Sequence, residues 1–149
     1  MNIDELREEI KRDEGSVNSV YLAHLNLPTT GIGHLITEQD EEYGKPVGTE
    51  VSEDRVNELF ATDIEVTISE CKELFDNFDD LPEEVQKICA NMMFNMGRPR
   101  LSKFKMFRAA LANKDWSECA VQMEDSRWHK QVTNRANRLI SRMRAVEGT

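Results

Sequence analysis

Apolar residues recur at helical spacing along most of the chain and form short, interrupted runs only near its start. The first of them, spaced three and four apart, predict an amphipathic helix over about residues 2–13. Between Val17 and Ile36, short apolar stretches alternate with Asn, Pro and Gly, which predicts a small antiparallel hairpin or a three-stranded sheet. The acid-rich stretch from Glu38 to Glu50 is predicted to be an exposed loop without chemistry of its own.

A long helix is predicted after this loop. Ser52 is its expected N-cap, and apolar residues continue at helical spacing as far as Phe78. The segment Asp79–Pro82 ends the pattern, and Pro82 suits the first turn of the next helix. That next helix is predicted to run to about Met96 with Gly97 as C-cap, and further helices are predicted over about 102–112, over about 116–124, and from Thr133 or Asn134 onward.

The fold class that follows is α+β and mostly α. We expect a single domain over residues 1–149 with an N-terminal lobe over about 1–51, which holds the short antiparallel sheet. A connecting helix over about 52–78 and a helical C-terminal lobe over about 79–149 complete it. A cleft between the lobes is then the expected ligand site.

The chain has a net charge of -9, and acidic and basic residues are distributed unevenly along it. Residues 1–97 carry 7 Lys and Arg against 23 Asp and Glu, a net charge of −16, whereas residues 98–149 carry 12 against 5, a net charge of +7. The basic part suits an anionic polymer such as a cell wall, although charge runs more commonly only solvate helix faces. Nucleic acid is not expected, because the acidic part repels phosphates and no basic-aromatic module is present.

Cysteine content and the N-terminus indicate where such a chain is made. The three Cys lie far apart on apolar helical stripes, and an odd number favours buried free thiols over a disulfide or metal site. We therefore expect synthesis in a reducing cytoplasm, without a signal peptide and without insertion into a membrane. No metal and no cofactor is expected.

An acid, a hydroxyl and a Gly-rich turn occur together in one short stretch of the sequence. Alone, an acid such as Glu14 at a helix end is most commonly a surface residue. Other motifs follow it in order, and the whole set is Asp13-Glu14-Gly15, Thr29, Thr30-Gly31-Ile32-Gly33-His34-Leu35, Asn91–Gly97, Trp116, Ser126-Arg127-Trp128 and Asn134–Arg138. Together they resemble the phage-type lysozymes of glycoside hydrolase family 24, over nearly the whole chain.

The resemblance implies a muramidase that hydrolyses the β-1,4 bond between N-acetylmuramic acid and N-acetylglucosamine in bacterial peptidoglycan. It implies that Glu14 is the general acid and that Thr29 holds the attacking water. Arg135 is implied as the cation that pairs with Glu14 and orients it. His34 is expected to support the site by hydrogen bonds to the acidic N-terminal lobe rather than as a proton shuttle.

The resemblance also assigns substrate-binding positions. Leu35 and Phe94 match residues that line the sugar cleft in the family, although both could equally belong to the core. Gln122 stands where the family often has Asn, so its amide is expected to reach an N-acetyl group. Phe107 replaces a small polar residue at another cleft position.

Ala23 departs from the family pattern. The family's catalytic Asp lies nine residues after the Glu and six before the Thr, and in this chain that position is Ala23. The substitution is open to three interpretations: an engineered knockout that traps substrate, a natural or designed variant that works with Glu14 and Thr29 alone, or a degenerate binder.

Three functions remain open at this stage. We favour a muramidase with activity reduced by Ala23. A lytic transglycosylase needs only one carboxyl group and is the first alternative; a catalytically silent peptidoglycan-binding or tail-assembly module is the second. By analogy with the family, we expect a monomer in the host cytoplasm, released to the periplasm and cell wall at lysis through a separate pore-forming holin.

Overall fold

The computed structural model describes residues 1–146 and divides the chain into two compact units. One unit is Arg7–Val66, and the other joins Met1–Leu6 to the chain from Thr67 onward. Helices dominate and a single small sheet occurs in the described residues, so the predicted α+β class, mostly α, is confirmed. That the chain acts as one domain stays a prediction.

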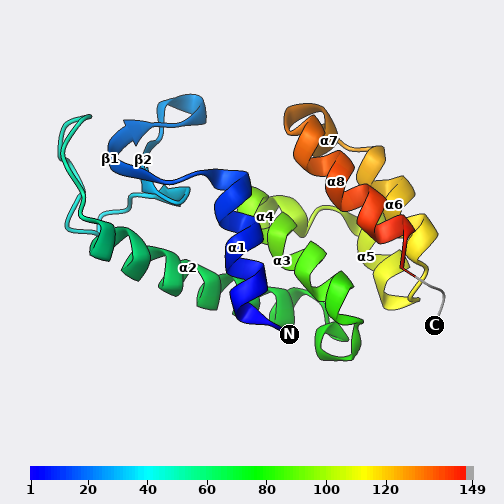
Figure 1. Cartoon of the computed structure of the whole chain (residues 1–149). Helices are drawn as coiled ribbons and strands as arrows, with labels where there is room; N and C mark the ends of the chain where they lie inside the picture. The colour runs from blue at the N-terminus through cyan, green and yellow to red at the C-terminus, as the bar shows by residue number, and fades with distance from the viewer. Residues whose placement is uncertain (147–149) are drawn as a thin grey trace. The chain divides into compact units, whose positions relative to one another are not determined.

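In the unit Arg7–Val66, three antiparallel strands form the sheet, in the order β1-β2-β3 (Figure 1). They are β1 (Val17–Leu22), β2 (Pro28–Gly31) and β3 (His34–Leu35), all inside the segment that the sequence assigned to β structure. Tyr21 lies directly opposite Thr29, and Thr29 lies opposite Leu35. Directly opposed residues project from the same face of a sheet, so these three side chains share one face.

The segment between Glu38 and Glu50 is not simply an exposed loop, and that prediction was wrong in this respect. The side chain of Glu42 is only 4% exposed, and its carboxylate accepts hydrogen bonds from Nε and a terminal nitrogen of Arg55, at 2.8 and 3.1 Å. These bonds hold the pKa of Glu42 below its ordinary value. Because Arg55 belongs to helix α2 (Glu53–Leu74), the two bonds fasten the loop to that helix.

The long helix α2 begins as predicted but ends early. The backbone N–H of Arg55 donates to Oγ of Ser52 at 3.1 Å, so Ser52 caps the helix. The helix stops at Leu74, not at Phe78, and a short 3₁₀ helix, η2 (Phe78–Asp80), follows. Phe75 and Phe78 are both buried, so the apolar pattern persists through a turn whose backbone has already left the helix.

The helical unit packs its C-terminal helices against one another. Helix α6 contacts α5 and α8, and α8 also contacts α3 and α7 (Figure 1). The helices are α3 (Glu83–Met96), α4 (Arg98–Leu101), α5 (Lys105–Ala112), α6 (Trp116–Glu124), α7 (Arg127–Gln131) and α8 (Thr133–Arg144). Gly97 ends α3 with a φ of 81°, as predicted, whereas the helix expected from about 102 starts only at Lys105.

The three thiols are buried and free, as predicted; they are Cys71, Cys89 and Cys119. Burial raises the pKa of each, so the thiols are unreactive at neutral pH.

Phe107 is a core residue of the helical unit. Its side chain is 1% exposed, and its ring packs edge-on against Phe75 and Phe104, with centroid distances of 6.3 and 6.4 Å. The aromatic side chain at this position therefore contributes to core packing.

We predict that Phe107→Ala lowers the free energy of unfolding by about 3–5 kcal/mol, because it leaves a cavity between two rings. Equilibrium unfolding in urea measures the loss. The neighbouring Met106 is 63% exposed, and Met106→Ala, as the control, should cost less than about 1 kcal/mol. Equal losses in the two variants would contradict a core role for Phe107.

Candidate active site

The carboxylate of Glu14 lies against the backbone of the turn between β2 and β3. Glu14 is the last residue of helix α1 (Ile3–Glu14). A Cβ placed on Gly33 would lie 2.5 Å from Oε1 of Glu14, and Gly33 has a φ of +64°. The backbone conformation at position 33 therefore favours glycine, and any side chain there would displace the Glu14 carboxylate from its place against the turn.

Tyr21 joins Glu14 and Thr29 at this site, and the sequence analysis missed it. Burial, and then the negative charge of Glu14, raise the pKa of the Tyr21 phenol above its ordinary value. Tyr21 also lies directly opposite Thr29. A strand period of two could have found it, because Tyr21 precedes position 23 by two residues and the backbone stays extended for one residue past the end of β1 at Leu22.

Ala23 and Thr29 meet at one carbonyl group. The Thr29 hydroxyl donates to the backbone oxygen of Leu27 at 2.9 Å, and the backbone N–H of Ala23 donates to the same oxygen at 2.9 Å. The hydroxyl hydrogen of Thr29 is thereby committed, while its oxygen can still accept a hydrogen bond from water. Residue 23 has extended backbone angles, with φ −88° and ψ −165°, which an Asp also adopts without strain.

His34 is held between two carboxylates. Its Nδ1 lies 2.7 Å from Asp63 on α2 and its Nε2 lies 2.8 Å from Asp40 in the 38–50 loop. Burial by itself lowers the pKa of His34, but the hydrogen bonds and charges of Asp63 and Asp40 outweigh it and raise the pKa to about 9. The predicted hydrogen bonds to acidic neighbours are present, and they fasten the turn that carries Gly33.

Of the predicted substrate-binding residues, Leu35 belongs to this group. It lies opposite Thr29 at the sheet edge and is 49% exposed. The structure therefore brings Glu14, Ala23, Thr29, His34 and Leu35 around one small sheet.

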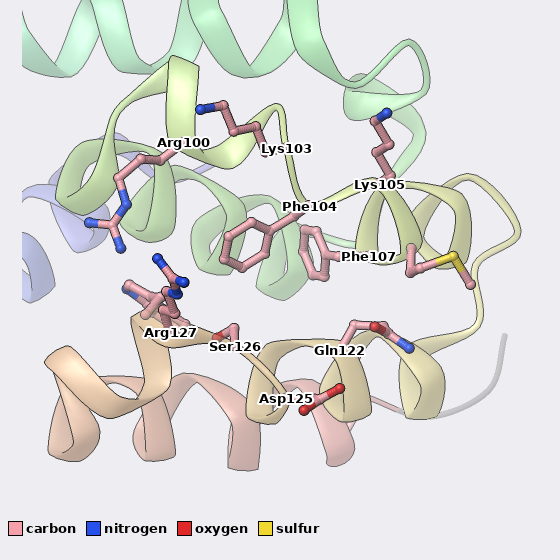
Figure 2. A pocket seen from close by; sticks show the side chains of 11 residues that line it. Arg100, Lys103, Phe104, Lys105, Phe107, Gln122, Asp125, Ser126 and Arg127 are labelled. Carbon is pink, nitrogen blue, oxygen red and sulfur yellow. The ribbon is translucent and has the colours of Figure 1, made fainter.

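The other three predicted site residues belong to the helical unit. Arg135 is buried on α8 and donates from Nε to Oδ1 of Asn91 on α3, at 2.8 Å. Phe94 is half-buried one turn further along α3. Gln122 lines a pocket with Phe107 and donates to Glu118 at 2.8 Å (Figure 2). Their roles toward Glu14 and the substrate stay predictions.

Two negative findings concern residues 1–146. No three His, Cys, Asp or Glu side chains in this part of the chain gather closely enough to hold a metal ion. No helix there has the length and apolar character needed to cross a membrane.

Comparison with known proteins gives a consistent result. The sequence profile described as Phage lysozyme matches residues 11–147. The chain is 30% identical over 158 residues to "Probable T4-type lysozyme 2" of Dictyostelium discoideum, covering 93% of each protein. "Probable T4-type lysozyme 1" of that organism is 29% identical over 161 residues, again covering 93% of each. "Pre-baseplate central spike protein Gp5" of Enterobacteria phage T4 is 27% identical over 152 residues, which cover 90% of this chain and 26% of that protein.

The position of His34 predicts how stability depends on pH. Its pKa rises from an ordinary 6.5 to about 9 in the folded chain. The contribution of His34 to the free energy of unfolding is therefore complete below pH 6.5 and is lost as the pH rises through about 9. Burial raises the pKa of Asp40, but hydrogen bonds from Thr37 and His34 lower it overall, so the contribution of Asp40 is lost under acid conditions. The full effect therefore lies between the acid range of Asp40 and about pH 6.5.

His34→Asn should lower the free energy of unfolding most near about pH 5–6, and by on the order of 3 kcal/mol less at about pH 10. Urea unfolding at a series of pH values measures this difference. Asp63→Asn, which removes one of the two acceptors, should give a smaller difference of the same form. If the loss of unfolding free energy in His34→Asn is the same at acid and alkaline pH, the ion pairs of His34 with Asp40 and Asp63 do not stabilise the fold.

The charge of Glu14 affects the titration of Tyr21, which leads to a prediction. Glu14→Gln removes one of the two causes that raise the pKa of Tyr21, so the phenol should titrate at lower pH in this variant. The chemical shift of the labelled Tyr21 ring across alkaline pH measures it. Glu8→Gln, an exposed change on the same helix, should leave the Tyr21 curve in place. Identical Tyr21 titration curves for the parent and Glu14→Gln would show that the charge of Glu14 does not affect the pKa of the phenol.

Proposed function

This chain belongs to the phage lysozyme family, and we propose that it hydrolyses the β-1,4 bond between N-acetylmuramic acid and N-acetylglucosamine in bacterial peptidoglycan. At the level of the family it is a lysozyme-like cell-wall hydrolase. The observation that carries the finer proposal is the position of Glu14: its carboxylate lies against Gly33, and its charge acts on Tyr21, which lies directly opposite Thr29 in the sheet.

In the proposed reaction, Glu14 donates its proton to the glycosidic oxygen as the bond to the anomeric carbon breaks. The sugar develops oxocarbenium character, and a water molecule held by the free acceptor side of the Thr29 hydroxyl attacks that carbon. The water's proton then passes to solvent or back to the Glu14 carboxylate. Arg135 orients Glu14, and Leu35, Phe94 and Gln122 contact the sugars.

The missing carboxylate at position 23 limits this reaction. Ala23 can neither accept the proton of the attacking water nor stabilise the positive charge on the sugar. Loss of a positioned base costs ~10²–10⁴ in rate. We therefore expect activity well below that of an enzyme with Asp at this position.

The same feature supports the second candidate, a lytic transglycosylase. There the muramic acid's own hydroxyl attacks the anomeric carbon, so no water has to be activated and one carboxyl group suffices. The two products differ by one water molecule, and mass spectrometry of digested sacculi separates them.

The third candidate is a catalytically silent wall-binding or tail-assembly module. The similarity to a central spike protein supports it. It predicts binding to purified sacculi without any fall in turbidity. The Glu14 and Thr29 arrangement favours a hydrolase over this candidate.

For the cellular setting we propose synthesis in the host cytoplasm and action as a monomer on the wall at lysis. Access would then depend on a separate holin. Expression in Escherichia coli with and without a holin tests this, because lysis should require both proteins.

Restoring the carboxylate tests the proposed function. Ala23→Asp should raise the rate of sacculus clearing by ~10²-fold or more, since the new side chain would start beside the Thr29 hydroxyl on an unstrained backbone. Glu14→Gln should abolish clearing in the parent and in the Ala23→Asp background, because an amide cannot donate the proton.

An unchanged or lower rate in Ala23→Asp would contradict the water-activation mechanism, and the transglycosylase would become the better account. The free energy of unfolding is the control for this experiment. Because residue 23 is half-exposed, the substitution should change that energy by about 0.5 kcal/mol or less.

A further inference from the structure

The loop that joins β1 to β2 carries an exposed cluster of leucines (Figure 1). The side chains of Leu22, Leu25 and Leu27 are 51%, 76% and 45% exposed, and we call residues 22–28 the hairpin tip. The segment from Ser16 to Thr37 contains no Asp, Glu, Lys or Arg, although these residues make up 32% of the chain. A cluster of large apolar side chains without charge, at an exposed turn, indicates a contact with something other than water.

Leu25 lies at the apex of the hairpin tip in a backbone conformation that leucine rarely adopts. Its φ is +63° and its ψ is +23°, in the left-handed region that glycine and asparagine occupy more readily. The backbone N–H of Asn26 donates to the oxygen of Ala23 at 3.0 Å, so the apex is a closed turn. Backbone strain that exposes a large apolar side chain points to a function for that side chain.

The leucines of the hairpin tip point in different directions. Leu22 lies directly opposite Pro28 in the pairing of β1 with β2, so these two side chains share one face. Leu27 has extended backbone angles, with φ −80° and ψ 129°, and precedes Pro28 by one residue, so its side chain projects from the other face. With Leu25 at the apex, both faces and the end of the tip are apolar.

This distribution favours a lipid phase over a protein or a sugar chain. A flat protein surface or a glycan strand contacts one face of a two-stranded ribbon, whereas lipid surrounds an inserted tip on every side. Binding energy at protein interfaces is concentrated on Trp, Tyr and Arg, and Leu is under-represented there. None of those three residue types occurs in residues 22–28, whereas leucine is a common inserted residue of segments that lie at a membrane surface.

We propose that the hairpin tip is a peripheral lipid-binding surface, and that it docks on a zwitterionic bilayer through Leu22, Leu25 and Leu27. This inference goes beyond the function proposed above and does not depend on it. The unit Arg7–Val66 carries 5 Lys and Arg against 14 Asp and Glu, so its charge opposes binding to an anionic surface. A zwitterionic surface avoids that repulsion and leaves the apolar contact to drive binding.

The backbone of the tip suits a shallow insertion. The N–H groups of Ala23 and Asn26 both donate within the turn, to the oxygens of Leu27 and Ala23, so they keep their partners when water is displaced. A segment at the membrane surface is buried by about 5–10 Å, which leaves the exposed polar side chains of His24 and Asn26 at headgroup level. The contact is therefore peripheral and does not cross the bilayer.

Flotation of the full chain with phosphatidylcholine vesicles tests the proposal. The parent should float with the vesicles, and binding should persist at high ionic strength because it does not depend on charge. The double substitution Leu22→Asn and Leu25→Asn should lower the partition coefficient by about tenfold or more, because two apolar side chains no longer enter the lipid. Asparagine tolerates the left-handed backbone at position 25, and the thermal unfolding midpoint checks that the variant folds.

The matched control is Tyr43→Asn with Val47→Asn. These side chains are 59% and 61% exposed and belong to the same unit, outside the hairpin tip. The control variant should bind the vesicles as the parent does. Absence of parent binding, or an equal loss of binding in the two double variants, would overturn the proposal.

A fluorescent label locates the contact without weakening it. The three native thiols are buried, so Leu25→Cys can be labelled selectively with an environment-sensitive dye. Its emission should shift to the blue when phosphatidylcholine vesicles are added, whereas the same dye on Val47→Cys should not respond. No response at position 25, or equal responses at both positions, would contradict docking through the tip.

Two other outcomes would assign the tip or the lipid contact differently and overturn the proposal. A dimer in sedimentation velocity that the Leu22→Asn and Leu25→Asn variant abolishes would show that a second copy covers the tip. Binding only to vesicles that contain phosphatidylglycerol, retained in this variant, would assign the lipid contact to the basic residues 98–149. Neither outcome bears on sacculus clearing, which tests the proposed function separately.

Discussion

The close approach of the Gly33 backbone to the Glu14 carboxylate is the constraint on which the site depends. Because position 33 is a glycine, the turn between β2 and β3 can lie directly against the acid, and a side chain there would displace the carboxylate. His34 holds this turn in place, because its ring nitrogens hydrogen-bond to Asp63 on α2 and to Asp40 in the adjoining loop. The loop itself is fastened to α2 by Arg55 and the buried Glu42. A chain of charged contacts therefore runs from α2 to the position of the candidate acid.

Hydrogen bonds organise the backbone around position 23, where the side chain is only a methyl group. Ala23 still donates its N–H to the Leu27 carbonyl, and Thr29 still directs its hydroxyl hydrogen to the same oxygen. Two donors on one carbonyl hold the end of β1 beside the hydroxyl that is proposed to hold water. An Asp at position 23 would therefore start from an ordered, extended backbone. These hydrogen bonds belong to the hairpin itself, so they would persist with any small residue at position 23.

Much of the fold and part of the site could be predicted from sequence because they depend on local patterns. Helical spacing, the Ser52 cap and Gly97 located helices, and the change of pattern after Val17 located the sheet. The pairing of Glu42 with Arg55 could not be predicted, because an acid-rich loop does not indicate which acid finds a partner on another element. The end of α2 at Leu74 could not be predicted either, because Phe78 remains buried beyond the helix and so continues the apolar pattern.

The distribution of charge shows the same limit of sequence reasoning. A net charge of +7 over residues 98–149 indicates a basic region but not which of its cations are available to a ligand. Some cations of this region form intramolecular pairs, such as Arg142 with Glu84, whereas others, among them Lys103, Lys114 and Lys130, have no ion-pair partner in residues 1–146. An anionic ligand gains most where it does not have to displace an existing carboxylate. The response of this region to an anionic polymer should therefore depend on which cations are unpaired as well as on its net charge.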